Sequence, residues 1–281
     1  MSAISNVTVS RNYFSLFFAT LGASLAQLVR APSHSRRAEA ARRSARHGLW
    51  LAAGIGALTI ALMVWLDATE IRLMPPRGTA SLWPLRILTD FGKSAYVLWA
   101  LAVLLFAVLI VSAGVRATAR SLLLGLGTRL QFLFFAVLAP VLAGEVIKWM
   151  VGRGRPFVGG EANAFNFSHF AGTEAYASFP SGHATTAFAL AFAVSALWPQ
   201  ARVAMLLYAI VIAATRLVLL AHHPSDVVAG ALVGVIGAMF VRYWFAARRL
   251  GFAISRDGTI VALPGPSFER FKRVARRPFG P

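Results

Sequence analysis

Three short stretches of this 281-residue chain carry the residue types needed to hold a phosphate group. They are Lys148 with Arg155-Pro156 beyond it, then Pro180-Ser181-Gly182-His183, and then Arg216 with His222 and Asp226. Each lies in or beside a strongly apolar segment, where charged side chains are unfavourable. A chain that keeps several such groups is expected to use them.

Phosphoryl transfer concentrates charge on three equatorial oxygens, so a phosphate site needs several fixed donors. Lys148, Arg155 and Arg216 supply three cations, and an arginine fork can meet two phosphate oxygens at once. Ser181 and Gly182 are expected at the start of a helix, where a hydroxyl and free backbone N–H groups add donors. Together the stretches predict a phosphate-binding cage.

Two histidines are expected to supply the nucleophile and the general acid. We expect His222 to be the nucleophile and His183 to be the acid that protonates the leaving oxygen. Asp226 follows His222 by four residues, so near a helix start its carboxylate can reach the ring and orient it. A metal site is the rival, but three nearby cations would repel a divalent ion, and neither metal nor cofactor is expected.

Composition places these stretches in a membrane, since the chain is 58% hydrophobic and 14% charged and has no cysteine. A helix crosses a bilayer with roughly 20 apolar residues. Six segments approach or meet that length, at about 49–66, 95–114, 130–147, 182–198, 203–220 and 226–246. Backbone groups in hydrocarbon must be satisfied internally. The predicted fold is therefore all-α, an integral membrane six-helix bundle in which Pro140 kinks the third helix.

Basic residues predict the orientation. Most of the 28 Lys and Arg residues precede the first span, join the second to the third, or follow the sixth. The positive-inside rule then puts both termini in the cytoplasm and the three stretches at the opposite face. The formal charge of +18 reflects this topology and attraction to anionic lipids. No nucleic-acid partner is expected, because no folded soluble domain is visible.

We divide the chain into a basic cytoplasmic segment at 1–48, a six-span core at 49–249 and a basic cytoplasmic tail at 250–281. Residues 13–29 suit an interfacial amphipathic helix, which we favour over a cleaved signal peptide. Residues 81–92 suit a second surface helix with Trp83, Leu85, Leu88 and Phe91 facing lipid. Residues 252–261 fit either a hairpin that turns at Asp257-Gly258 or a loose tail.

Some polar residues have plainer explanations. Arg153 is expected to be a snorkelling anchor at the end of the third span, and Lys148 has the same alternative. Glu145 is expected to pair with a neighbouring cation. The connection 157–179 is either a rim that guides lipid or a loop capped by buried aromatics; its phenylalanines are Phe157, Phe165, Phe167, Phe170 and Phe179.

The three stretches resemble the signature of the type 2 phosphatidic acid phosphatase superfamily, K-x6-R-P, P-S-G-H and S-R-x5-H-x3-D. The one departure is Thr215, which stands where the signature has serine and keeps the hydroxyl. The resemblance implies metal-free dephosphorylation through a phosphohistidine, on the six-helix scaffold of the membrane lipid phosphatase branch. It further implies a bacterial inner-membrane protein with its site facing the periplasm.

Substrates within this resemblance are undecaprenyl pyrophosphate, which we slightly prefer, phosphatidylglycerophosphate, phosphatidic acid and lipid A phosphates. Two alternatives stay open. One is a lipid phosphotransferase that uses the same intermediate, and the other is a non-catalytic lipid-binding or transport protein. Intact histidines together with Asp226 favour an enzyme.

Overall fold

The computed structural model describes residues 12–156, 158–159, 162–255 and 257–265. Its α-helices are α1 (Tyr13–Val29), α2 (His34–Trp65), α3 (Asp67–Leu73), α4 (Trp83–Asp90), α5 (Ser94–Gly114), α6 (Ala117–Val151), α7 (Gly182–Leu197), α8 (Arg202–Val218) and α9 (Pro224–Ala247). Strands β1 (Phe252–Ile254) and β2 (Ile260–Ala262) pair antiparallel. Short 3-10 turns cover Ala80–Leu82, Glu174–Tyr176 and Pro199–Ala201. The predicted all-α class is confirmed.

Each predicted span corresponds to one α-helix, and five of the six lie in long apolar helical stretches. Among the described residues, five helical stretches are long and apolar enough to cross a membrane: His34–Trp65, Ala80–Gly114, Ala117–Val151, Pro199–Val218 and Pro224–Ala247. The fourth predicted span corresponds to α7, an apolar helix of 16 residues that is shorter than these. The chain is a multi-pass membrane protein, and the count of six spans stays a prediction. The kink at Pro140, which lies inside α6, also stays a prediction.

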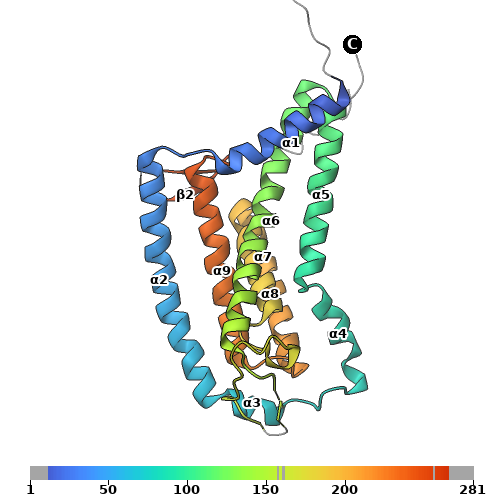
Figure 1. Ribbon diagram of the computed structural model, residues 1–281, viewed down its shortest axis with the longest axis vertical. Coiled ribbons are helices and arrows are strands. Elements are labelled where there is room, and N and C mark those ends of the chain that lie inside the picture. The colour runs from blue at the N-terminus through green and yellow to red at the C-terminus, as the bar shows by residue number, and fades with distance from the viewer. Residues whose placement is uncertain (1–11, 157, 160–161, 256, 266–281) are drawn as a thin grey trace, which may run out of the picture.

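The long helices run side by side, and α1 crosses one end of the bundle while α3 lies at the other end (Figure 1). Helices α7 and α9 pack on each other at the centre, and small residues let them approach closely. A Cβ atom added to Gly234 of α9 would lie 2.4 Å from the Thr185 carbonyl oxygen of α7. A Cβ at Gly237 would lie 2.5 Å from Cβ of Pro140 in α6. These glycines bring α6, α7 and α9 into one core.

Outside the spans, the observed helices and strands agree with the prediction from the sequence, with one difference. Residues 13–29 form α1. Phe252–Ile254 and Ile260–Ala262 pair as the two strands of a hairpin, so the alternative of a loose tail is wrong for these residues. In the predicted surface helix, Trp83 and Phe91 are exposed. Leu85 and Leu88 are half-buried, so they do not face lipid fully as predicted, because α4 packs against α8. Residues 1–11 and 266–281 of the two basic segments lie outside the described residues.

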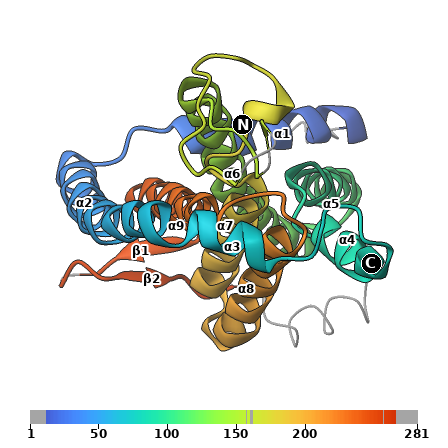
Figure 2. The same cartoon turned by 90° about the horizontal axis from the view of Figure 1, so that it is seen from below.

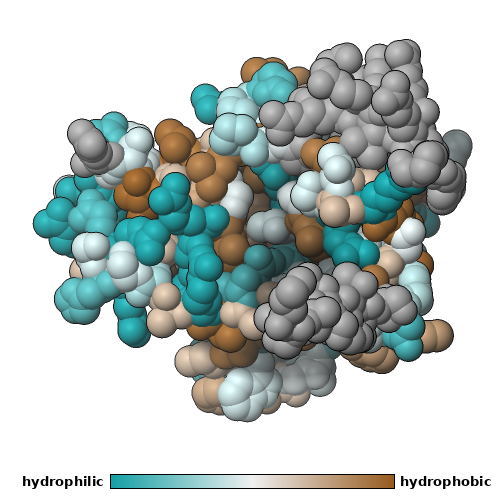
Figure 3. Space-filling view, turned by 90° about the horizontal axis from the view of Figure 1, so that it is seen from above, coloured by the Kyte–Doolittle hydropathy of each residue, from teal (hydrophilic) through white to brown (hydrophobic). Residues whose placement is uncertain are grey.

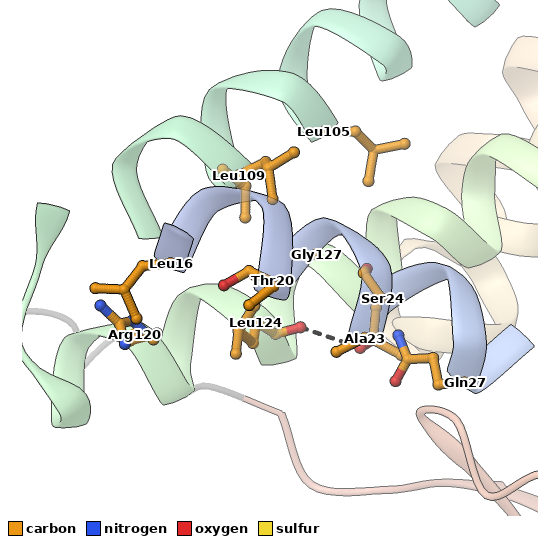
Figure 4. A pocket seen from close by; sticks show the side chains of 13 residues that line it. Leu16, Thr20, Ala23, Ser24, Gln27, Leu105, Leu109, Arg120, Leu124 and Gly127 are labelled. Atoms are coloured by element: carbon orange, nitrogen blue, oxygen red, sulfur yellow. Dashed lines mark hydrogen bonds between the residues drawn. The ribbon is translucent and has the colours of Figure 1, made fainter. Parts of the chain in front are cut away.

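Basic residues from distant parts of the sequence gather at the end that carries α1 and the hairpin. Arg30 donates to the Arg248 carbonyl (2.7 Å), and Arg43 donates to the Asp257 carbonyl (2.9 Å). Figure 3 shows hydrophilic residues among hydrophobic ones on the coloured part of this end. A cavity of about 320 Å³ lies there between α1, α5 and α6, with Leu16, Leu105 and Arg120 among its lining residues (Figure 4). That cavity is at the opposite end of the bundle from the three stretches.

Candidate active site

Alternating helix directions bring the three stretches to the same end of the bundle. Lys148 lies in the last turn of α6, and Ser181 caps the start of α7. Arg216 lies in the last turn of α8, and Asp226 lies in the first turn of α9. These helix ends lie near α3 and beside the connection between α6 and α7 (Figures 1 and 2).

Direct contacts join the second stretch to the other two. The Ser181 N–H donates to the Asp226 carbonyl at 2.9 Å. A Cβ at Gly182 would lie 3.0 Å from Nζ of Lys148, so this ammonium group points at the start of α7. Ser181 and Gly182 therefore stand at a helix N-terminus, as the sequence predicts, with a cation directly beside it.

Each of the three predicted cations is held by neighbours. Lys148 forms an ion pair with Glu145, which confirms the expected role of that carboxylate. Arg155 donates through Nε to the Glu174 carbonyl (3.0 Å) and through Nη1 to the Ala221 carbonyl (3.5 Å), next to His222. Arg216 is buried and donates to Oγ1 of Thr89 in α4 (2.8 Å).

His222 lies in the loop between α8 and α9 and is 3% exposed. Its Nδ1 is 2.8 Å from the Ser178 carbonyl oxygen. Because a carbonyl can only accept, Nδ1 carries the proton in this contact, and Nε2 of the neutral ring keeps its lone pair. Burial, followed by the charges of Arg216 and Arg155, lowers the pKa of His222 well below its usual value. The ring is therefore neutral at neutral pH and suited to act as a nucleophile.

Asp226 is linked to this ring through Ser178 rather than directly. Its Oδ2 is 3.9 Å from Nδ1 of His222, which is beyond hydrogen-bonding distance. Oδ2 instead accepts from Oγ of Ser178 at 2.6 Å and from the His223 N–H at 2.9 Å. Ser178 thus connects the carboxylate to the histidine. The sequence gives no sign of this serine, since its type and position match no part of the three stretches.

Among the site residues predicted from the sequence, three polar atoms are buried and lack a hydrogen-bond partner in the described part of the chain. They are Oγ of Ser181, Nε2 of His183 and Nε of Arg216. Buried polar groups are almost always hydrogen-bonded, so each unpartnered one requires an explanation. All three belong to predicted phosphate-site residues. A phosphate ester bound among them would supply the missing acceptors.

Arg153 is not the snorkelling anchor that the sequence suggests. Its side chain is completely buried, with Nη2 2.7 Å from Oδ2 of Asp67 and Nη1 2.6 Å from Oδ1 of Asp226. The helix ends at Gly152 with a left-handed conformation (φ +57°), so the chain leaves the axis of α6 before Arg153. One feature of the sequence could have indicated a buried partner for Arg153. Asp67, one of only ten acidic residues, comes directly after the first predicted span.

The connection between α6 and α7 carries several aromatic side chains. Phe165, Phe167 and Phe170 are exposed, so the alternative of buried aromatics is wrong for these three. Phe179 is half-buried, and Phe157 lies outside the described residues. Exposed phenylalanines at the site end agree with a rim that contacts lipid, which stays a hypothesis.

Comparisons with known proteins agree with the geometry. The family described as the PAP2 superfamily matches residues 129–250, which contain all three stretches. Proteins named "Lipid A 1-phosphatase" from Rhizobium johnstonii and Rhizobium etli are 36% and 35% identical over 174 residues, covering 61% of this chain and 71% and 75% of the relatives. "Putative undecaprenyl-diphosphatase YbjG" from Escherichia coli is 37% identical over 100 residues, or 33% of this chain and 47% of that protein. No solved structure matches significantly.

Proposed function

Because this chain belongs to the PAP2 superfamily, we propose that it is a metal-independent membrane phosphatase that hydrolyses a lipid phosphate or pyrophosphate through a phosphohistidine. One observation carries the proposal. The neutral His222 ring is held at Nδ1 by the Ser178 carbonyl. In the same site, Ser181, His183 and Arg216 each have a buried polar atom that has no partner among the described residues.

The reaction divides into two balanced steps. Nε2 of His222 attacks phosphorus, and the bond from phosphorus to the leaving oxygen breaks. His183, which takes up a proton when the negatively charged phosphate binds beside it, gives that proton to the leaving oxygen. The neutral His183 then takes a proton from water while the water oxygen bonds to phosphorus. The N–P bond breaks, and inorganic phosphate and free His222 result.

Fixed cations stabilise the charge that develops on the phosphoryl oxygens. Lys148, Arg155 and Arg216 approach from α6, the following connection and α8, and the start of α7 adds backbone N–H groups. This is the role that a metal ion plays in many phosphoryl-transfer enzymes. We therefore assign charge stabilisation to the side chains of this protein.

Among substrates, we place a lipid A 1-phosphate ahead of undecaprenyl pyrophosphate, the preference from sequence alone. Two relatives named for the first activity align over 174 residues, whereas the one named for the second aligns over 100. Both substrates present a phosphate at a membrane surface, where the exposed phenylalanines near the site can contact lipid tails. We further propose that the site faces the periplasm from a bacterial inner membrane, because the basic residues gather at the opposite end.

The test is release of inorganic phosphate by purified protein, with chelator present, from lipid A, undecaprenyl pyrophosphate, phosphatidylglycerophosphate and phosphatidic acid. We expect release, fastest from lipid A, and none from a His222→Ala variant. Release only in the presence of a second lipid that becomes phosphorylated would indicate a phosphotransferase. No release from any of these lipids would contradict the enzyme and favour a lipid-binding protein.

A further inference from the structure

A cluster of buried charges lies next to His222, on the side of its Nδ1 atom, and includes Asp226. Arg153 bonds Asp67 and Asp226, and all three side chains are completely buried. Ser225 joins the same cluster, because its Oγ accepts from Nη1 of Arg153 at 2.6 Å and its N–H donates to Oδ1 of Asp67 at 3.0 Å. Burying charges without water is unfavourable unless each is paired, as these are.

We infer that Asp67 and Arg153 are positioning residues that fix Asp226 and keep an excess negative charge next to His222. This inference rests on the proposed phosphohistidine chemistry. Neither residue belongs to the three stretches, and Asp67 lies outside the region 129–250 that matches the family. Helix α3 would thus contribute to the active site from the N-terminal part of the chain.

The charge count gives Asp67 its role. One guanidinium serves two carboxylates, so the cluster formed by Asp67, Arg153 and Asp226 carries a formal charge of −1. When Nε2 of His222 bonds to phosphorus and Nδ1 keeps its proton, the ring becomes positively charged. A net negative charge nearby in a water-poor site stabilises that ring. Without Asp67, Arg153 would neutralise Asp226 and remove this effect.

The negative charge of the cluster favours a positive His222 ring, whereas the other groups that face His222 disfavour it. Arg216 of α8, Arg155 of the connection and His183 of α7 all disfavour a positive ring, and burial has the same effect. Asp226 of α9 is the carboxylate beside the ring. The geometry is transmitted through hydrogen bonds, from Asp67 to Arg153, to Asp226, to Ser178 and to Nδ1 of His222.

The experiment measures how easily His222 takes a proton, without requiring turnover. Diethyl pyrocarbonate modifies an imidazole ring only when the ring is neutral. Tandem mass spectrometry that distinguishes His222 from the adjacent His223 gives the extent of modification of His222 at each pH. In the Asp67→Asn variant we expect the midpoint to move to lower pH, because a negative charge is lost. In Arg153→Gln it should move to higher pH, because a positive charge is lost.

Two controls separate this role from folding. Glu70→Gln lies on the same helix, and burial followed by repulsion from Asp67 and Asp226 raises the pKa of Glu70 to about 7. Its carboxyl is already protonated at lower pH, so this variant should keep the wild-type midpoint. Glu39→Gln removes a carboxylate of α2 on the side of the hairpin, where Glu39 pairs with Arg43, and should also change nothing.

Kinetics supply the second measurement. On the lipid that wild type hydrolyses, Asp67→Asn should lower kcat by ~10–100-fold with little change in KM, as expected for a residue behind a catalytic group. An unchanged midpoint in both Asp67→Asn and Arg153→Gln, or an equal shift in Glu70→Gln, would overturn the inference. If wild type hydrolyses no lipid, the proposed function fails, but the modification midpoints still decide the role of the cluster.

Discussion

At the scale of single residues, the structure assigns His222 a specific protonation state. Nδ1 holds its proton against the Ser178 carbonyl, and burial with two nearby arginines keeps the ring neutral. The sequence predicted the histidine and the aspartate but placed a direct bond between them. The serine between them could not be predicted, because the loop that carries it is positioned only by the packed helices.

This protonation state predicts the pH dependence of the reaction. A proton on His222 removes the nucleophile, and the pKa of His222 lies well below the usual value of about 6.5. The acid limb of the profile of kcat/KM against pH should therefore fall below pH 6.5, with full nucleophile at pH 7. An acid limb centred at or above 6.5 would show that the ring is not kept neutral in this way.

A second prediction concerns Thr89, whose hydroxyl accepts a hydrogen bond from Nη1 of the buried Arg216. Thr89→Val keeps the shape and removes the acceptor, which costs roughly 1 kcal/mol or about fivefold. We expect that loss in kcat/KM for phosphate release. Thr79→Val is the matched control, since the Thr79 hydroxyl donates to the Pro76 carbonyl in an exposed turn. Equal effects of the two substitutions would exclude a specific role for Thr89.

At the scale of elements, close packing of α7 and α9 sets the site. The six apolar segments and the helix starts at Ser181 and near Asp226 were predictable from hydrophobic runs and capping residues. The buried position of Arg153 was not, since a basic residue at the end of a span has the same local pattern whether it points inward or outward. Only the turn at Gly152 and the carboxylates on α3 and α9 decide between the two.

Gly230 of α9 tests this packing. A Cβ there would lie 2.4 Å from the Ser181 carbonyl oxygen and 3.1 Å from Cβ of Ala184. Gly230→Ala should force the start of α7 away from α9, destabilise the protein by ~1–3 kcal/mol and lower kcat together with the unfolding temperature. Gly54→Ala is the control, because nothing lies within 4 Å of that position. A Gly230→Ala variant with wild-type stability and activity would contradict the packing argument.

At the scale of the whole molecule, the bundle separates two ends with different chemistry. One end holds the proposed phosphate site and the exposed phenylalanines, and the other holds α1, the hairpin and clustered arginines (Figure 1). Charge distribution along the sequence predicted this separation. It follows from a simple physical constraint, because helices that cross a bilayer in alternation return every second connection to the same side.

The absence of cysteine from the sequence allows a direct test of orientation. A single cysteine at Phe170, exposed near the site, should react with a membrane-impermeant maleimide in spheroplasts. A single cysteine at Arg42, exposed on α2, should react only after the membrane is opened. The reverse pattern would place the site in the cytoplasm.

The most direct test of the account is to capture the intermediate on His222. Wild-type protein is mixed with its lipid substrate, quenched within milliseconds at alkaline pH, where phosphohistidine is stable, and mapped by mass spectrometry. We predict a phosphoryl group on His222 in wild type and none in His222→Ala. A phosphoryl group on another residue, or full hydrolysis by His222→Ala, would contradict the central claim.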